Sequence, residues 1–119
     1  MTRNRWHILC EGETLTVTRA LPVRLDVSAQ TVLPTGSRLR LAQQVRQDLW
    51  RRMQGLRGFR PVVRVTRHGE TCHVLAGGRV EGRFSRPHAE TEISDMLSDP
   101  DLRARWSAYA AHREVARAS

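Results

Sequence analysis

The chain has 119 residues, of which 39% are hydrophobic and 27% are charged, with a formal net charge of +8. This length allows one domain with one hydrophobic core, and the composition excludes a disordered chain. No apolar run approaches the roughly 18 residues that a membrane-spanning helix requires, and the N-terminal region lacks the apolar stretch of about 7 to 15 residues found in signal peptides. We therefore expect a single domain over residues 1–119, located in the cytoplasm.

All 20 basic residues are arginines, and lysine is absent. A strongly basic chain often binds nucleic acid, but arginine without lysine is also typical of a GC-rich genome. Residues 87–101 contain no arginine and five acidic residues, so this segment can neutralise part of the basic surface. The two cysteines are too few for a disulfide framework and are expected to be reduced. Net charge alone therefore favours a nucleic-acid partner only weakly.

Alternating apolar residues predict strands in the first part of the chain. Residues 5–19 are typical of a hairpin, because Trp6, Ile8 and Cys10 share one phase of an extended strand and a Glu-Gly-Glu turn follows them. In this phase Cys10 is expected to be a small core residue. A third strand is predicted over residues 23–28, and the proline before it favours an edge position in the sheet.

The longest periodic stretch predicts a helix over residues 37–57. Ser37 is suited to cap its N-terminus, and Gly58 is suited to end it in the left-handed conformation. The apolar residues of the stretch fall on one stripe, as an amphipathic helix requires. These stripe residues are Leu41, Val45, Leu49 and Leu56.

The second half of the chain predicts a hairpin over residues 61–76, a tight turn at Gly77-Gly78 and a short strand over 80–84. Two helices follow, one over residues 87–97 and one that begins with Asp99 as its N-cap. Hairpins interrupted by one long helix predict an α+β fold. We expect an antiparallel sheet of about five strands (two hairpins plus an edge strand) packed on one long central helix, with two shorter C-terminal helices.

The polar face of the central helix is the first candidate site. Arginine and glutamine side chains can reach phosphates and base edges, but any surface helix presents a polar face to solvent. Residues 22–34 do not form the companion helix of a helix-turn-helix motif, which argues against docking in the major groove. The residues that we single out for contact with a protein or a nucleic acid are Arg40, Gln44, Arg46, Gln47, Trp50, Arg51, Arg57, Arg64 and Arg67.

Two residues of this helix depart from the amphipathic pattern. Trp50 lies toward the polar side, where it suits either a protein interface or a stacking platform for bases. The interpretation that we favour is that the C-terminal helix covers it with Trp106 and Tyr109. Arg52 lies inside the apolar stripe, and an unpaired charge there would be costly. Its stem can lie along the core with the charge in solvent, or it can pair with a carboxylate of residues 90–101, and we expect it to have a partner.

No residue pattern indicates catalysis. The thiols and imidazoles of His7, Cys10, Cys72 and His73 are spaced so that they fall on opposite faces of their strands, whereas zinc needs ligands that converge on one point. We therefore expect no metal, no cofactor and no enzymatic activity. The leading hypothesis is a small non-enzymatic interaction or accessory protein that acts through protein–protein contact or as a homodimer. The alternative is a nucleic-acid backbone-binding protein that uses the arginine-rich helix and hairpin.

Overall fold

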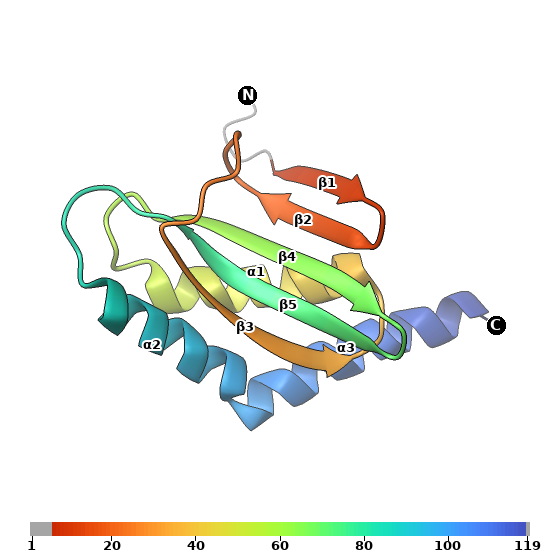
Figure 1. Cartoon of the computed structure of the whole chain (residues 1–119). Coiled ribbons are helices and arrows are strands. Elements are labelled where there is room, and N and C mark those ends of the chain that lie inside the picture. The colour runs from red at the N-terminus through yellow and green to blue at the C-terminus, as the bar shows by residue number, and fades with distance from the viewer. Residues whose placement is uncertain (1–5, 119) are drawn as a thin grey trace.

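The computed structural model describes residues 6–118, and the side chains of residues 6–111. Within this range the chain forms one five-stranded antiparallel sheet and three helices (Figure 1), which confirms the predicted α+β fold. The sheet order is β1-β2-β4-β5-β3. The strands are β1 (His7–Glu11), β2 (Thr14–Thr18), β3 (Val27–Pro34), β4 (Arg60–His68) and β5 (Thr71–Arg79), and the helices are α1 (Arg38–Met53), α2 (Arg86–Ser98) and α3 (Pro100–Ala118).

Two hairpins build most of the sheet, as predicted, and β3 adds at one edge. Both hairpins close through a two-residue turn whose first residue is a glycine at positive φ, Gly12 at 62° and Gly69 at 58°. Glycine at this position is the signature of a type II′ turn, whose twist matches that of the paired strands. Arg5, which the predicted first hairpin included, lies outside the described residues.

The third strand lies later in the chain than predicted, at Val27–Pro34 and not at residues 23–28. The alternation at 23–26 belongs to the connection that carries the chain from β2 past β4 and β5 to the far edge (Figure 1). Asp26 fixes the end of this connection. Its N–H donates to the carbonyl of Gly78 (2.8 Å), and its carboxylate accepts the N–H of Val80 (2.9 Å).

The predicted turn at Gly77-Gly78 was wrong, because both glycines lie inside β5, and residues 80–84 form no strand. Neighbouring backbone approaches these positions too closely for a side chain. A Cβ at Gly77 would collide with the carbonyl oxygen of Val27, and one at Gly78 with the carbonyl oxygen of Arg60. The glycines therefore serve close packing within the sheet rather than a change of direction.

Helix α1 begins as predicted, with the Ser37 hydroxyl accepting the N–H of Arg40 at 3.2 Å. It ends at Met53, earlier than expected, and Gly58 takes its positive φ in the turn that follows. Of the stripe predicted for this helix, Leu41, Val45 and Leu49 are in the core, whereas Leu56 lies after the end of the helix and is half-buried. Helix α3 has 19 residues against 16 in α1, so the expectation of two shorter C-terminal helices was wrong for α3.

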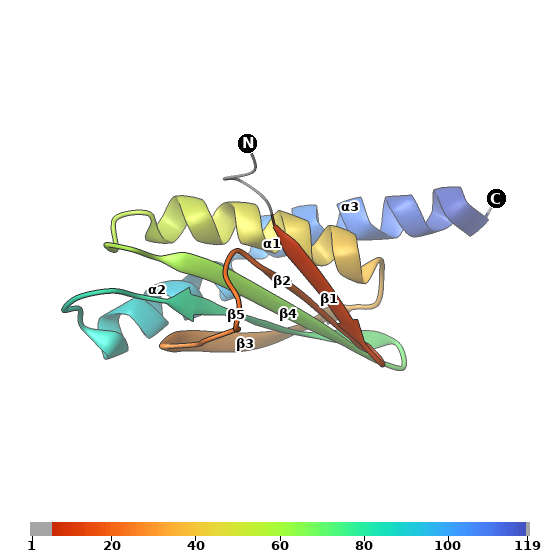
Figure 2. The ribbon, with the colours of Figure 1, turned by 90° about the horizontal axis from the view of Figure 1, so that it is seen from above.

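The helices lie on one face of the sheet, and Figure 2 shows the molecule in a second view, turned by 90° from Figure 1. Helices α1 and α2 pack on this helix face, and α3 packs on α1 and α2. One continuous hydrophobic core fills the space between these layers. The opposite face, here called the open face, carries no helix among the described residues. None of the described helices is long and apolar enough to cross a membrane.

Candidate functional site

Strand β1 forms one edge of the sheet, and among the described residues it pairs only with β2. The two-residue turn closes on the pair Glu11–Thr14, which in a hairpin of this type is hydrogen-bonded. The neighbouring strand agrees with this phase, since the N–H of Arg67 in β4 donates to the carbonyl of Glu13 at 3.0 Å. The backbone groups of Ile8 and Cys10 therefore point away from β2, toward the outer edge.

The side chains of β1 are exposed on both faces of the sheet. Ile8 on the helix face is 48% exposed, and Leu9 on the open face is 41% exposed. Cys10 is also exposed, so its predicted place in the core was wrong. The reason is that α1 packs over β2, β4 and β5 but, within the described residues, makes no contact with β1.

An arginine–tryptophan stack lies where the chain enters β1. The guanidinium carbon of Arg46 lies 4.3 Å from the ring centroid of Trp6, and that of Arg19 lies 5.3 Å from it. Such cation–π contacts hold the ring and the guanidinium groups in fixed positions. Burial, together with the nearby charge of Arg19, lowers the pKa of Arg46 below its ordinary value.

Trp50 follows Arg46 by one helical turn and lies on the same side of α1. It is 43% exposed, so the interpretation that α3 covers it was wrong. Trp106 of α3 is instead fully buried, and its indole Nε1 donates to a carboxylate oxygen of Asp48 at 2.7 Å. Tyr109 of α3 lies under the guanidinium of Arg40, 4.3 Å from it. Trp50 thus stays exposed at the surface, one helical turn after the arginine that contacts Trp6.

Asp48 was not singled out in the sequence, although it is a buried carboxylate. It also accepts a hydrogen bond from Arg105 at 2.7 Å and lies 3.6 Å from Arg51. Its position three residues after Val45 places it at the border of the apolar stripe, which is the one signal that could have identified it. Asp48 therefore joins α1 to α3.

Arg52 pairs with Glu92 of α2, with Nε to Oε1 at 2.9 Å. This confirms the expectation that it has a partner, a carboxylate of residues 90–101. The hydrogen bond from Arg52 is the main cause that holds the pKa of Glu92 below its ordinary value of 4.5. Arg52 thus links α1 to α2.

The remaining candidate residues lie on several separate surfaces. Arg64 lies on the open face and donates to the Thr16 hydroxyl at 3.3 Å, whereas Arg67 lies on the helix face and donates to the carbonyl of Gly36 at 2.7 Å. Gln44 is half-buried on α1, and Gln47 and Arg57 are exposed, Arg57 in the turn after the helix. The structure therefore places Arg46 against Trp6, just before β1, with Trp50 one turn further along α1, and leaves the other candidate arginines on separate surfaces.

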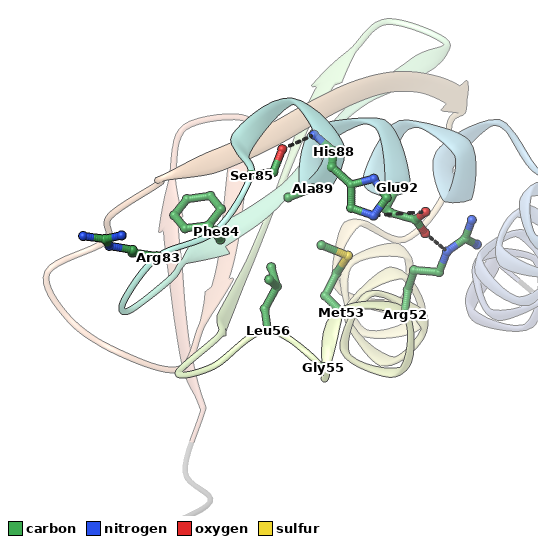
Figure 3. Close-up of a pocket in the computed structure, with 10 residues that line it drawn as sticks. All are labelled: Arg52, Met53, Gly55, Leu56, Arg83, Phe84, Ser85, His88, Ala89 and Glu92. Atoms are coloured by element: carbon green, nitrogen blue, oxygen red, sulfur yellow. Dashed lines mark hydrogen bonds and ion pairs between the residues drawn. The ribbon is translucent and has the colours of Figure 1, made fainter.

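A cavity of about 310 Å³ opens between the end of α1 and the start of α2 (Figure 3). Its floor is apolar, with Met53, Leu56 and Ala89, and Ser85 at its rim caps α2 by accepting the N–H of His88 at 3.3 Å. The Arg52–Glu92 pair closes one side, so its two charges satisfy each other. His88 and Glu92 also line this cavity, with Nε2 of His88 4.0 Å from a carboxylate oxygen of Glu92.

The thiols and imidazoles do not converge. Cys10 is exposed on β1, Cys72 is buried in β5, and the rings of His68 and His73 stack with centroids 4.4 Å apart. Among the described side chains, no three from His, Cys, Asp or Glu are grouped so that they could hold a metal ion. Comparisons with protein-family models, curated proteins and solved structures find no match to this chain.

Proposed function

We propose that the chain is a non-enzymatic interaction module that contacts protein through the outer edge of β1 and the adjoining surface of Trp6, Arg46 and Trp50. The observation that carries this proposal is that the outward backbone groups of Ile8 and Cys10 lie beside exposed apolar side chains. Open, apolar sheet edges promote pairing with another chain, and proteins usually block them. Tryptophan and arginine are the residues most enriched where binding energy concentrates.

The mode of contact that fits this surface is strand addition. A partner strand that pairs with β1 gains main-chain hydrogen bonds, while side-chain contacts on alternate residues supply specificity. Exposed Ile8 provides apolar contact on the helix face of the edge and exposed Leu9 on the open face, and we assign Trp50, exposed on α1, to the same contact surface.

Capture from cell lysate with the immobilised chain tests this proposal, provided that a second, differently tagged copy of the chain is included. Ile8→Lys places a charge at the edge, and Trp50→Ala removes the exposed ring. Both variants are expected to lose the captured protein. The matched control is Val32→Lys, because Val32 is 45% exposed on the other edge strand. It is expected to retain the captured protein.

Equal capture by all variants would contradict the proposal, as would no capture by the wild type. The nucleic-acid hypothesis predicts a different result, namely a mobility shift with duplex or single-stranded nucleic acid that weakens steeply with salt. Since Arg40, Arg51 and Arg67 make contacts within the chain, we expect no such shift at low salt.

A further inference from the structure

We infer that the partner of the β1 edge is a second copy of this chain, joined antiparallel, β1 to β1, about a twofold axis at Leu9. This inference rests on the proposed function and names the partner for the same surface. Three properties of residues 7–11 carry it: the pattern of outward backbone groups, the distribution of charge, and the space at the ends of the strand.

The backbone pattern of β1 is self-complementary in this register. Ile8 of one copy lies opposite Cys10 of the second copy, and Cys10 opposite Ile8. Both are the residues whose N–H and C=O groups point outward, so each pair exchanges two N–H···O=C bonds, as hydrogen-bonded antiparallel pairs do. A register moved by two residues in either direction keeps only one outward residue of β1 opposite an outward residue of β1. A register moved by one residue places the outward backbone groups of one copy opposite residues of the second copy whose backbone groups face β2.

Charge distribution favours the same register. With Leu9 at the axis, His7 lies opposite Glu11 of the second copy, and Glu11 opposite His7. An imidazole N–H can donate to a carboxylate, and opposite charges across a strand pair stabilise it. Both side chains lie on the open face with Leu9, whose apolar side chain meets its own symmetry mate. The strand is therefore complementary to itself in charge and in polarity.

The ends of the strand leave room for the second copy. Trp6 lies opposite Gly12 of the second copy, and Gly12 has no side chain and no atom near the position where one would stand. On the helix face, Ile8 of each copy lies opposite Cys10 of the second copy. The result is one continuous sheet with five strands from each copy, which leaves the two β3 strands as its outer edges.

A disulfide experiment tests the register directly. Residues at the axis form a non-hydrogen-bonded pair, with Cα atoms about 4.5 Å apart, which lies within the range that a disulfide spans. The Leu9→Cys, Cys10→Ser double variant is therefore expected to form a covalent dimer under mild oxidation. Cys10 in the wild type lies diagonal to Cys10 of the second copy, at about 7–8 Å, and is expected not to cross-link. Val32→Cys with Cys10→Ser is the matched control at the other edge, and it is expected to stay monomeric on a denaturing gel.

A charge exchange tests the His7–Glu11 pairing in solution by analytical ultracentrifugation. His7→Glu sets two like charges opposite each other twice in the dimer, and it is expected to weaken self-association about tenfold. His7→Glu combined with Glu11→Lys restores opposite charges and is expected to restore the wild-type dissociation constant within about threefold. Equal weakening in the single and the double variant would overturn this register.

The outcomes separate this inference from the proposed function. A wild-type chain that is monomeric at all concentrations, yet captures another protein in a way that Ile8→Lys abolishes, overturns the second copy and leaves the interaction module standing. A monomer that captures nothing overturns both. A dimer that cross-links through Val32→Cys, or through the native Cys10 but not through Leu9→Cys, overturns the Leu9-centred pairing.

Discussion

The two edges of the sheet are treated in opposite ways. At β3, side chains of the helices bond two of the outward backbone groups: Glu90 of α2 accepts the N–H of Ser28 at 3.0 Å, and Arg103 of α3 donates to the carbonyl of Val32 at 2.7 Å. At β1, no side chain of the described residues makes such a bond to Ile8 or Cys10. The difference teaches that this fold can use α2 and α3 to bond one sheet edge, and that within residues 6–111 the β1 edge receives no comparable side-chain bond.

The largest expected effect comes from removing the Asp48 contacts that join α3 to α1. Helix α3 carries Arg103, whose side chain bonds the β3 edge. In Asp48→Ala the indole of Trp106 loses its acceptor inside the core, and Arg105 loses its ion pair. We expect a loss of about 2–3 kcal/mol in the free energy of unfolding, measured by urea denaturation. Asp48→Asn keeps an acceptor oxygen and should lose less. Equal losses in both variants would mean that charge, and not the hydrogen bond to Trp106, sets the effect.

Arg103→Ala removes the block at β3 more selectively. The guanidinium also donates to the Thr31 hydroxyl at 2.6 Å and to the Leu97 carbonyl at 3.0 Å. Its loss is expected to cost about 1–2 kcal/mol and to speed amide hydrogen exchange along β3, while exchange in β1 stays as it is in the wild type. Arg51→Ala, which removes an exposed arginine 3.6 Å from Asp48 on α1, is the control and should cost about 0–0.5 kcal/mol.

Low pH is expected to destabilise the start of β3, because it protonates the carboxylate of Asp26. The N–H of Val80, which donates to this carboxylate, is the main cause that holds the pKa of Asp26 below its ordinary value of 3.8. A carboxyl group with a lowered folded-state pKa contributes stability above its unfolded pKa and loses it as pH falls through the folded value. We expect the urea midpoint of the wild type to fall below about pH 4, with a shallower fall in Asp26→Asn. An identical acid slope in the two proteins would refute this role.

The smallest expected effect concerns Arg46, which contacts Trp6 just before β1. Arg46→Gln removes one cation from the Trp6 ring and should lower the free energy of unfolding by about 0.5–1 kcal/mol, measured by urea denaturation. Because Arg19 still contacts the ring, Trp6 should remain partly protected from acrylamide. If the variant is as stable as the wild type, the Arg46 contact contributes nothing to holding the start of β1.

Local patterns in the sequence were sufficient for the elements that depend on neighbours along the chain. Ser37 as a cap and the buried residues Leu41, Val45 and Leu49 of α1 followed from spacing of a few residues. The hairpin turns also followed, because a glycine at positive φ is a local requirement. These signals fix an element's type and its buried face without knowledge of the tertiary fold.

The features that failed depend on contacts between distant parts of the chain. Ile8 and Cys10 have the phase of core residues, and the sequence does not show that α1 stops short of β1. Gly77 and Gly78 have the composition of a turn, and only the register with β3 and β4 shows why a side chain is excluded. Trp50 is exposed for a comparable reason, since the direction of α3 is set by Asp48 and Trp106. The candidate surface therefore emerged from the sheet order, which no local pattern reveals.

The three tryptophans occupy different environments: Trp106 is fully buried, Trp6 is half-buried under two arginines, and Trp50 is exposed. Fluorescence emission from the chain consequently carries separable contributions. A blue shift in the emission of the exposed Trp50 would report that a partner occupies the β1 edge. A red shift in the emission of the buried Trp106 would report unfolding of the core. The intrinsic tryptophan fluorescence of the protein therefore distinguishes association from unfolding without an attached dye.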